Sequence, residues 1–355
     1  MKAGKCVKAA VCVLVSVVSI SCAARKPEPF EFSMLFIGDI LLSNEVEKKI
    51  LANGTGYPFA KIKGDMKKYS FIIGNLEAPI STRGEMYEDK AYQFEVDPYV
   101  ASCLKDLEID AVSISNNHLL DYGEVGMYDT IYFLRQWQIM HTGAGKNLEE
   151  AKRPAVFRCG PTEICLLSYC TRPPLDYFAT EDSAGISPFH PESAYEDVRR
   201  LKKEGNIVIV LMHWGIEQTK KPQAIQKYYA RKMIDAGADG IIGHHPHWPQ
   251  GVEIYKGKPI IYSLGNFING FYNRIEKDNI MAALYYHGSR LKKIEIIPIV
   301  GKNTGKNFQP YVMEGSAALK CLKEIRNLSA PFGTQMDIST ERGVIIPDMV
   351  NPSKK

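Results

Sequence analysis

The feature that most constrains the fold is a set of five short apolar segments, each followed directly by a polar cluster. The segments have the length and composition of buried strands, and they are residues 33–37, 70–73, 110–115, 207–212 and 240–242. The clusters are Gly38-Asp39, Asn75-Leu76-Glu77, Asn117-His118, His213 and His245-Pro246-His247. In open α/β sheets, ligands bind beyond the carboxyl ends of the strands. The sequence therefore predicts a single site at one sheet edge.

Between these segments lie helical patterns and further strands. Helices are expected at residues 45–51, 125–138, 147–151 and 223–236, the last ending at Gly237. Hairpins are expected over 155–169, 254–263 and 282–299. We interpret 143–145 as a turn before the third helix. Alternation of strand and helix favours a layered α/β fold. We find no strong linker after residue 30, which predicts one domain over 31–345.

The first 22 residues differ from the rest of the chain. Lys2, Lys5 and Lys8 precede an apolar stretch, 9–20, which as a helix is about 18 Å long and too short to cross a bilayer. The stretch ends at Cys22 in a pattern that is similar to a bacterial lipobox. We expect a signal peptide over 1–22, a lipid on Cys22 and a tether over 23–30, with an ordinary signal peptide as the alternative. The protein would then be an exported, membrane-anchored lipoprotein that faces the periplasm or the cell exterior.

Charge and cysteine content exclude some classes. The formal charge of +4 falls to +1 without the three lysines of the leader. A nearly neutral chain without a basic run gives no reason to expect nucleic acid as a partner. Five cysteines follow Cys22, and we interpret them as small buried residues. Pairing among Cys159, Cys165 and Cys170 is the alternative.

The polar clusters carry the ligand types of a metal centre. His245 and His247 are two residues apart after an apolar strand, so in an extended loop they can serve two ions. A mixture of Asp, Glu, Asn and His suits two divalent ions, of Mn, Fe or Zn, better than a structural zinc, which prefers Cys. Two such ions clamp a phosphoryl oxygen and generate a hydroxide nucleophile. The sequence has no G-x-S-x-G, Walker A or H-E-x-x-H motif, so other hydrolase and nucleotide chemistries lack support.

Seven motifs occur in an order that resembles the CapA (poly-γ-glutamate capsule biosynthesis) family, over about residues 33–270. They are Gly38-Asp39-Ile40, Asn75-Leu76-Glu77-Ala78-Pro79, Ser115-Asn116-Asn117-His118 with Asp121 and Gly123, Thr142-Gly143-Ala144-Gly145, His213-Trp214-Gly215, Gly243-His244-His245-Pro246-His247 and Tyr262-Ser263-Leu264-Gly265-Asn266-Phe267. That family is similar to calcineurin-like metallophosphoesterases. The resemblance implies a four-layer α-β-β-α sandwich.

The resemblance also implies a role for each matching residue. The metal ligands would be Asp39, Glu77 as the bridging carboxylate, Asn117, His213, His245 and His247. His118 would be the acid beside the leaving group, and Asp121 would orient it. The same pocket would be lined by Asn75, Asn266 and His244.

Two departures from the wider superfamily bear on activity. The usual D-x-H is Asp39-Ile40-Leu41 here, so one ion loses a His ligand, and Glu77 replaces an Asp. One of the two sites is thereby expected to be weak or empty, and the reaction stays open.

Two functions follow from these patterns. The first is a divalent-metal-dependent hydrolase of a phosphoester, or of another bond, in envelope-polymer metabolism. The second is a non-catalytic envelope protein that binds or helps export an anionic polymer such as poly-γ-glutamate, with other capsule-synthesis proteins. The intact His118 favours the enzyme, and the near-neutral charge counts against the polymer binder.

Overall fold

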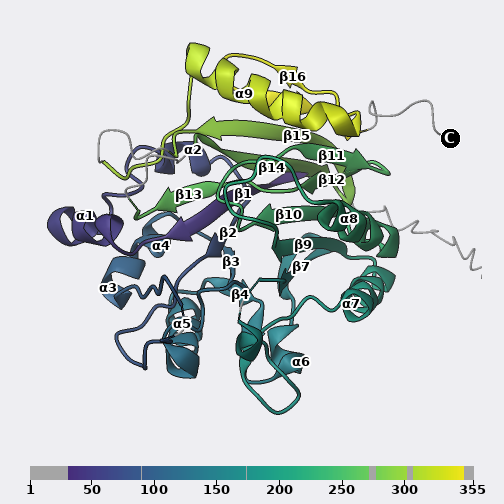
Figure 1. Cartoon of the computed structure of the whole chain (residues 1–355). Helices are drawn as coiled ribbons and strands as arrows, with labels where there is room; N and C mark the ends of the chain where they lie inside the picture. The colour runs from purple at the N-terminus through teal and green to yellow at the C-terminus, as the bar shows by residue number, and fades with distance from the viewer. Residues whose placement is uncertain (1–30, 89, 173, 272–276, 302–306, 348–355) are drawn as a thin grey trace, which may run out of the picture.

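The computed structural model describes residues 31–347 apart from 89, 173, 272–276 and 302–306. The expected signal peptide, Cys22 and the tether fall outside the described residues. Figure 1 shows two sheets stacked at the centre of the molecule, with helices covering their outer sides. No helix among the described residues is long and apolar enough to cross a membrane.

The first sheet contains β1 to β4, which are parallel to one another, and an antiparallel half on the other side of β1. Its path is β16-β17-β15-β14-β1-β2-β3-β4, and β13 pairs with the end of β1. The bounds are β1 (Glu31–Leu41), β2 (Phe71–Leu76), β3 (Ala111–Ser113), β4 (Met140–Thr142), β13 (Asn266–Asn269), β14 (Asn279–His287), β15 (Arg290–Ile299), β16 (Asp337–Ile338) and β17 (Gly343–Ile345).

The second sheet has the order β11-β12-β10-β9-β7-β6, with a parallel centre and a hairpin at each edge. The bounds are β6 (Ala155–Cys159), β7 (Thr162–Cys170), β9 (Ile207–His213), β10 (Gly240–His244), β11 (Val252–Tyr255) and β12 (Lys258–Ile261). A separate pair joins β5 (Ala144–Gly145) to β8 (Gly185–Ile186), so the expected turn at 143–145 includes a short strand.

Three cores separate the layers, because side chains of a strand point alternately to its two faces. Leu35 and Ile37 of β1 face one set of helices, and Met34 and Phe36 face the second sheet. The helices on the first sheet are α1 (Glu45–Asn53), α2 (Lys63–Met66), α3 (Pro98–Ala101), α4 (Cys103–Asp106) and α5 (Gly123–Gln136). Those on the second sheet are α7 (Pro191–Lys203) and α8 (Ala224–Ala236). The predicted four-layer α-β-β-α sandwich is confirmed.

Other elements complete the molecule. α9 (Gly315–Ser329) extends the core between the two sheets, and it lies along β15 at the top of Figure 1. α6 (Leu148–Ala151) and the 3-10 turns η1 (Leu175–Tyr177) and η2 (Ala330–Phe332) are short connections. No disulfide joins the cysteines between residues 31 and 347, and four of these five cysteines are buried.

The five strands that carry the polar clusters are confirmed, but their ends differ from those expected. β2, β9 and β10 continue to Leu76, His213 and His244, and β3 ends earlier, at Ser113. The largest difference is at β1, which was expected to end at Ile37 but continues through Asp39 to Leu41. The continuation forms because β13 pairs alongside, with Asp39 opposite Asn266. Asp39 is therefore held inside the sheet rather than on a loop.

Candidate metal centre

The predicted site residues come together where the carboxyl ends of β1, β2 and β3 meet those of β9 and β10 (Figure 1). Asp39, Glu77, His213 and His245 are all buried there. The amide of Glu77 donates to the carbonyl of Ile40 at 3.0 Å, which fixes the residue after β2 against β1.

Two glycines allow the strand ends to approach so closely. A Cβ on Gly38 would lie 1.9 Å from the carbonyl oxygen of Gly265, and a Cβ on Gly243 would lie 1.9 Å from that of Tyr262. The amide of Asp39 then donates to the Gly265 carbonyl at 3.0 Å. Gly38 and Gly243, which precede Asp39 and His244, are therefore required for the close packing of the site.

A first group of donors consists of Asp39, Glu77 and His247, whose ligand atoms lie within 4.8 Å of one another. Nδ1 of His247 is 3.3 Å from Oδ2 of Asp39 and 3.8 Å from Oε2 of Glu77. Two carboxylates and an imidazole form a donor set for a divalent transition-metal ion.

A second group consists of Glu77, His213 and His245, with the same spacing limit of 4.8 Å. Nε2 of His213 is 3.6 Å from Oε1 of Glu77 and 2.7 Å from Oδ1 of Asn117. Glu77 thus belongs to both groups, one oxygen facing each, which is the position of a bridging carboxylate.

Two orphaned atoms test whether the residues fit metal ions. Oε1 of Glu77 and Nδ1 of His245 are buried and have no hydrogen-bond partner. Such atoms are costly in a folded protein unless something satisfies them. Both belong to the donor groups, and a cation bound there would supply the missing partner. The described donors therefore fit divalent ions.

The backbone of the histidine loop is also unusual. His245 and His247 have φ values of 91° and 57°, in a region that non-glycine residues seldom occupy. Such conformations persist only where the surroundings hold them, and they cluster at functional sites. The loop is held because the amide of His245 donates to Oδ2 of Asp39 at 3.3 Å.

Burial and charge set the protonation of the donors. Burial raises the pKa of Asp39, but hydrogen bonds from His244 and His247 outweigh it and hold that pKa well below its usual range. Burial and the charge of Asp39 raise the pKa of Glu77. Burial lowers the pKa of His213 and of His245, which keeps both imidazoles neutral, as metal ligation requires.

The three residues expected to line the pocket support the donors. Nδ2 of Asn75 donates to Oδ1 of Asp39 at 2.8 Å, and Nδ1 of His244 is 3.2 Å from the same oxygen. Oδ1 of Asn266 is 2.9 Å from Nδ1 of His247. Only Asn266 of the three lines the open pocket, because Asn75 and His244 lie on Asp39. Partners of this kind orient metal ligands.

His118 and Asp121 form the expected pair, and a third residue joins them. Nδ1 of His118 is 2.7 Å from Oδ2 of Asp121. The ammonium of Lys90 contacts Oδ1 of Asp121 and the carbonyl of Asn117, and it lies 3.2 Å from Nδ1 of His118. Burial lowers the pKa of His118 and of Lys90. Sequence reasoning missed Lys90, because nothing in the sequence around it distinguishes a buried lysine from a solvated one.

A pocket of about 250 Å³ opens above the donors. Glu77, His118 and His247 are part of its lining, together with Glu217 and Gln218. Its aromatic lining residues are Tyr92, Phe94, Trp248 and Phe271. The ring of Phe94 lies 4.5 Å from that of His118, so the acid candidate is packed against an aromatic wall. Glu217 is a second residue that sequence reasoning missed, although it follows His213 by four positions.

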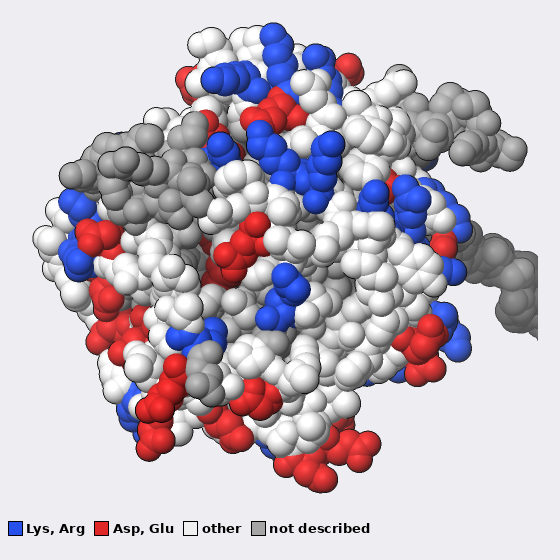
Figure 2. Space-filling model, viewed as in Figure 1, with Lys and Arg blue, Asp and Glu red and all other residues white. Residues whose placement is uncertain are grey.

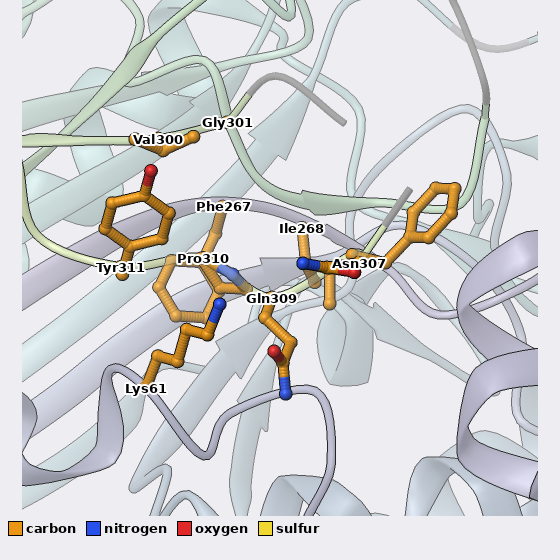
Figure 3. A pocket seen from close by; sticks show the side chains of 10 residues that line it. Lys61, Phe267, Ile268, Val300, Gly301, Asn307, Gln309, Pro310 and Tyr311 are labelled. Carbon is orange, nitrogen blue, oxygen red and sulfur yellow. The ribbon is translucent and has the colours of Figure 1, made fainter. Parts of the chain in front are cut away.

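A separate pocket of about 200 Å³ lies against β13 (Figure 3). Lys61, Phe267, Gln309 and Tyr311 are among its lining residues. None of the described residues that line it is a His, Cys, Asp or Glu. It therefore lacks the donors of a metal site.

The fold and the donor groups define a class: an α-β-β-α sandwich with a candidate two-ion centre at the carboxyl ends of its strands. The family model described as "Bacterial capsule synthesis protein PGA_cap" matches residues 33–271, well over half of the chain. The chain belongs to this family.

Relatives with curated names agree with this assignment. The chain is 30% identical over 269 residues to the PGA biosynthesis protein CapA of Bacillus subtilis, which covers 75% of this chain and 71% of that protein. It is 28% identical over 276 residues to the capsule biosynthesis protein CapA of Bacillus anthracis, covering 76% and 67%. A probable polyglutamine synthesis accessory protein of Mycobacterium tuberculosis is 30% identical over 208 residues, covering 56% and 55%.

Solved structures resemble the chain only distantly. The NAD nucleotidase of Haemophilus influenzae aligns with a TM-score of 0.42 and 12% identity, over 84% of this chain and 56% of that one. The Thermus thermophilus sulfate thiohydrolase SoxB aligns with a TM-score of 0.39 and 14% identity, over 74% and 42%.

Proposed function

We propose that this capsule-family protein is a divalent-metal-dependent hydrolase that cleaves a phosphoester bond in cell-envelope polymer metabolism. One observation carries the proposal: Glu77 belongs to two donor groups at a pocket that is also lined by His118, and Asp121 holds His118 from behind. Two ions and an acid that share one pocket are the parts required for phosphoester hydrolysis.

The chemistry divides between the ions and the side chains. When bound, the ions supply Lewis acidity and lower the pKa of a coordinated water. Asp121 occupies Nδ1 of His118, which leaves Nε2 as the nitrogen that passes a proton to the leaving oxygen. Phe94 packs on the same imidazole and limits its access to water. Mn, Fe and Zn all suit a carboxylate–imidazole donor set.

A direct experiment uses the purified chain without residues 1–22. We expect one tightly bound divalent ion per chain and a second, more weakly bound one. We also expect hydrolysis of p-nitrophenyl phosphate or bis-p-nitrophenyl phosphate that a chelator abolishes and Mn²⁺ restores. The variant His213→Ala is expected to lose an ion and the activity together. Less than one ion per wild-type chain, with no change in the cell from His213→Ala, would rule out the enzyme.

The proposed location rests on residues 1–30. A signal peptide over 1–22, a lipid on Cys22 and a tether over 23–30 would place the domain outside the cytoplasm, facing the periplasm or the exterior. A single Cys22→Ser change tests this, since it should move the protein from the membrane fraction to the soluble one. Mass spectrometry of the wild-type N-terminus would show the lipid directly.

A second candidate, the non-catalytic polymer binder, has one feature in its favour. A pocket of about 370 Å³ beside the centre is lined by Trp248, Lys220, Lys277 and Lys320. On the face seen in Figure 2, basic side chains gather toward the top, where α9 lies. Glu324 pairs with Lys220 at 2.6 Å and offsets part of that charge.

Binding measured without turnover separates the two candidates. Oligo-γ-glutamate would be titrated into the His213→Ala variant, with Lys277→Gln/Lys320→Gln as its comparison. Salt-sensitive binding that the lysine changes abolish would support the polymer-binding function. The partners of this protein would then include the capsule-synthesis proteins that deliver the polymer.

A further inference from the structure

We propose that Glu217 is a metal ligand of this centre, giving a carboxylate oxygen to the ion held by Asp39, Glu77 and His247. The inference rests on the proposed metal centre and deepens it by adding a ligand.

The first step is the set of donors around the two positions. Glu77, His213 and His245 are joined by Asn117, whose Oδ1 is 2.7 Å from Nε2 of His213. Asp39, Glu77 and His247 are joined in the same way by Asn266, whose Oδ1 is 2.9 Å from Nδ1 of His247. The end of β1 adds no further donor, because Leu41 is the residue that reaches the pocket wall there.

The second step is the position of Glu217. Its carboxylate and the ring nitrogens of His245 and His247 form a third group of ligand atoms within 4.8 Å of one another. His247 belongs to this group and to the one with Asp39 and Glu77, so Glu217 adjoins the position that those three residues define. Glu217 also lines the pocket beside Glu77 and His247.

The third step is the backbone that carries Glu217. The amide of Gln218 donates to the carbonyl of Pro246 at 2.8 Å, and the amide of Trp214 donates to that of His244 at 3.2 Å. These two bonds tie the loop after β9 to the histidine loop on both sides of Glu217. The backbone that carries Glu217 is therefore fixed beside the histidine loop.

An independent observation points to a cation at the same place. Nδ1 of His245, whose ring belongs to the Glu217 group, is buried and has no hydrogen-bond partner. Glu217 itself is exposed, and no ion pair holds its carboxylate within the described part of the chain. A buried orphaned ring nitrogen and a carboxylate without an ion pair therefore belong to the same group as His247.

Metal binding tests the inference without any substrate. Metal-free chain, lacking only residues 1–22, is titrated with Mn²⁺ in a calorimeter, and bound manganese is counted by elemental analysis. Glu217→Gln and Glu217→Ala are compared with wild type, with His213→Ala and with Glu181→Gln, an exposed glutamate in a different pocket. Apo melting curves check that every variant folds.

We expect wild type and Glu181→Gln to bind two ions. Glu217→Gln should weaken one of them by on the order of 10- to 100-fold and leave the other within about twofold. His213→Ala should weaken the other ion instead, and the spin-coupled Mn–Mn resonance should disappear in both variants.

Two results overturn the assignment, and they differ. If Glu217→Gln binds both ions as wild type does and changes only KM, Glu217 is a substrate contact and the metal centre stands. If wild type binds no ion, the proposed function fails, and the role of Glu217 fails with it.

Discussion

Nδ1 of His118 lies 2.7 Å from Oδ2 of Asp121, while the other oxygen of that carboxylate contacts the ammonium of Lys90. The hydroxyl of Tyr177 donates to this second oxygen of Asp121, Oδ1, at 3.3 Å, and the amide of Phe94 donates to Oδ2 of Asp121 at 2.9 Å. Asp121 is fully buried, so these contacts replace its hydration. One carboxylate thereby fixes both the ring of His118 and the loop that carries Lys90.

Replacing Asp121 by Asn should affect turnover more than binding. Asparagine keeps the shape, but its amide cannot stabilise an imidazolium and can present an N–H to Nδ1, which favours the wrong tautomer of His118. We expect kcat to fall by about 10²- to 10⁴-fold on a phosphodiester, with KM and bound metal unchanged. Asp182→Asn, in an exposed bend, is the control. An unchanged kcat would show that the His118–Asp121 pair does not take part in the reaction.

Lys90 should matter for stability. Its side chain is 12% exposed and that of Asp121 is fully buried, so Lys90→Met leaves a buried carboxylate without its cation. We expect the free energy of unfolding to fall by about 3–5 kcal/mol, measured by urea denaturation. The double variant Lys90→Met/Asp121→Asn should recover part of that loss, because no unpaired charge remains. If the two single variants' losses of unfolding free energy simply add in the double variant, Lys90 and Asp121 do not stabilise each other.

A pH prediction comes from His141 on β4, away from the donors. Burial, with Arg135 and Arg153 nearby, lowers the pKa of His141 to about 4. Since the unfolded chain has a histidine pKa of about 6.5, the unfolded state binds more protons between pH 4 and 6.5. The contribution of His141 to stability is therefore fully present above about pH 7 and is lost as the pH falls toward 4.

The variant His141→Gln lacks this proton uptake. Between pH 8 and 5, wild type should lose about 2 kcal/mol more free energy of unfolding than the variant, measured by denaturant melts at each pH. Equal losses would show that the side chain is not desolvated in solution.

Local patterns in the sequence, the apolar runs and the polar clusters after them, predicted a layered α/β fold and the sheet edge at which the site lies. The four-layer arrangement was implied by the family resemblance. Asp39 and His245 were placed from such local patterns alone. The burial of Asp39 inside the sheet could not be predicted from local patterns. It depends on the pairing of β1 with β13, which joins residues more than 220 positions apart. Helix α7, with its many charged residues, and α9 were likewise not predicted.

Lys90 and Glu217 show why part of the site stayed hidden. Their residue types are common on solvated loops, and only tertiary structure reveals that one is buried against Asp121 and the other lies beside two histidines. The motif order could identify candidate metal donors at the ends of strands. It could not identify side chains of the site that are carried by loops folding back over those ends.

The close approach of β1 to β13 yields the last prediction, the variant Gly38→Ala. An added Cβ would meet the Gly265 carbonyl at 1.9 Å, so the strands must separate and Asp39 must shift away from the histidines. We expect a loss of about 2–3 kcal/mol in unfolding free energy, together with weaker Mn²⁺ binding. Gly64→Ala is the matched control, because its Cβ would meet nothing within 4 Å in α2 and should be neutral or stabilising. If Gly38→Ala bound Mn²⁺ as tightly as the control, the position of Asp39 would not depend on this approach, and its role as a ligand set by the sheet would have to be abandoned.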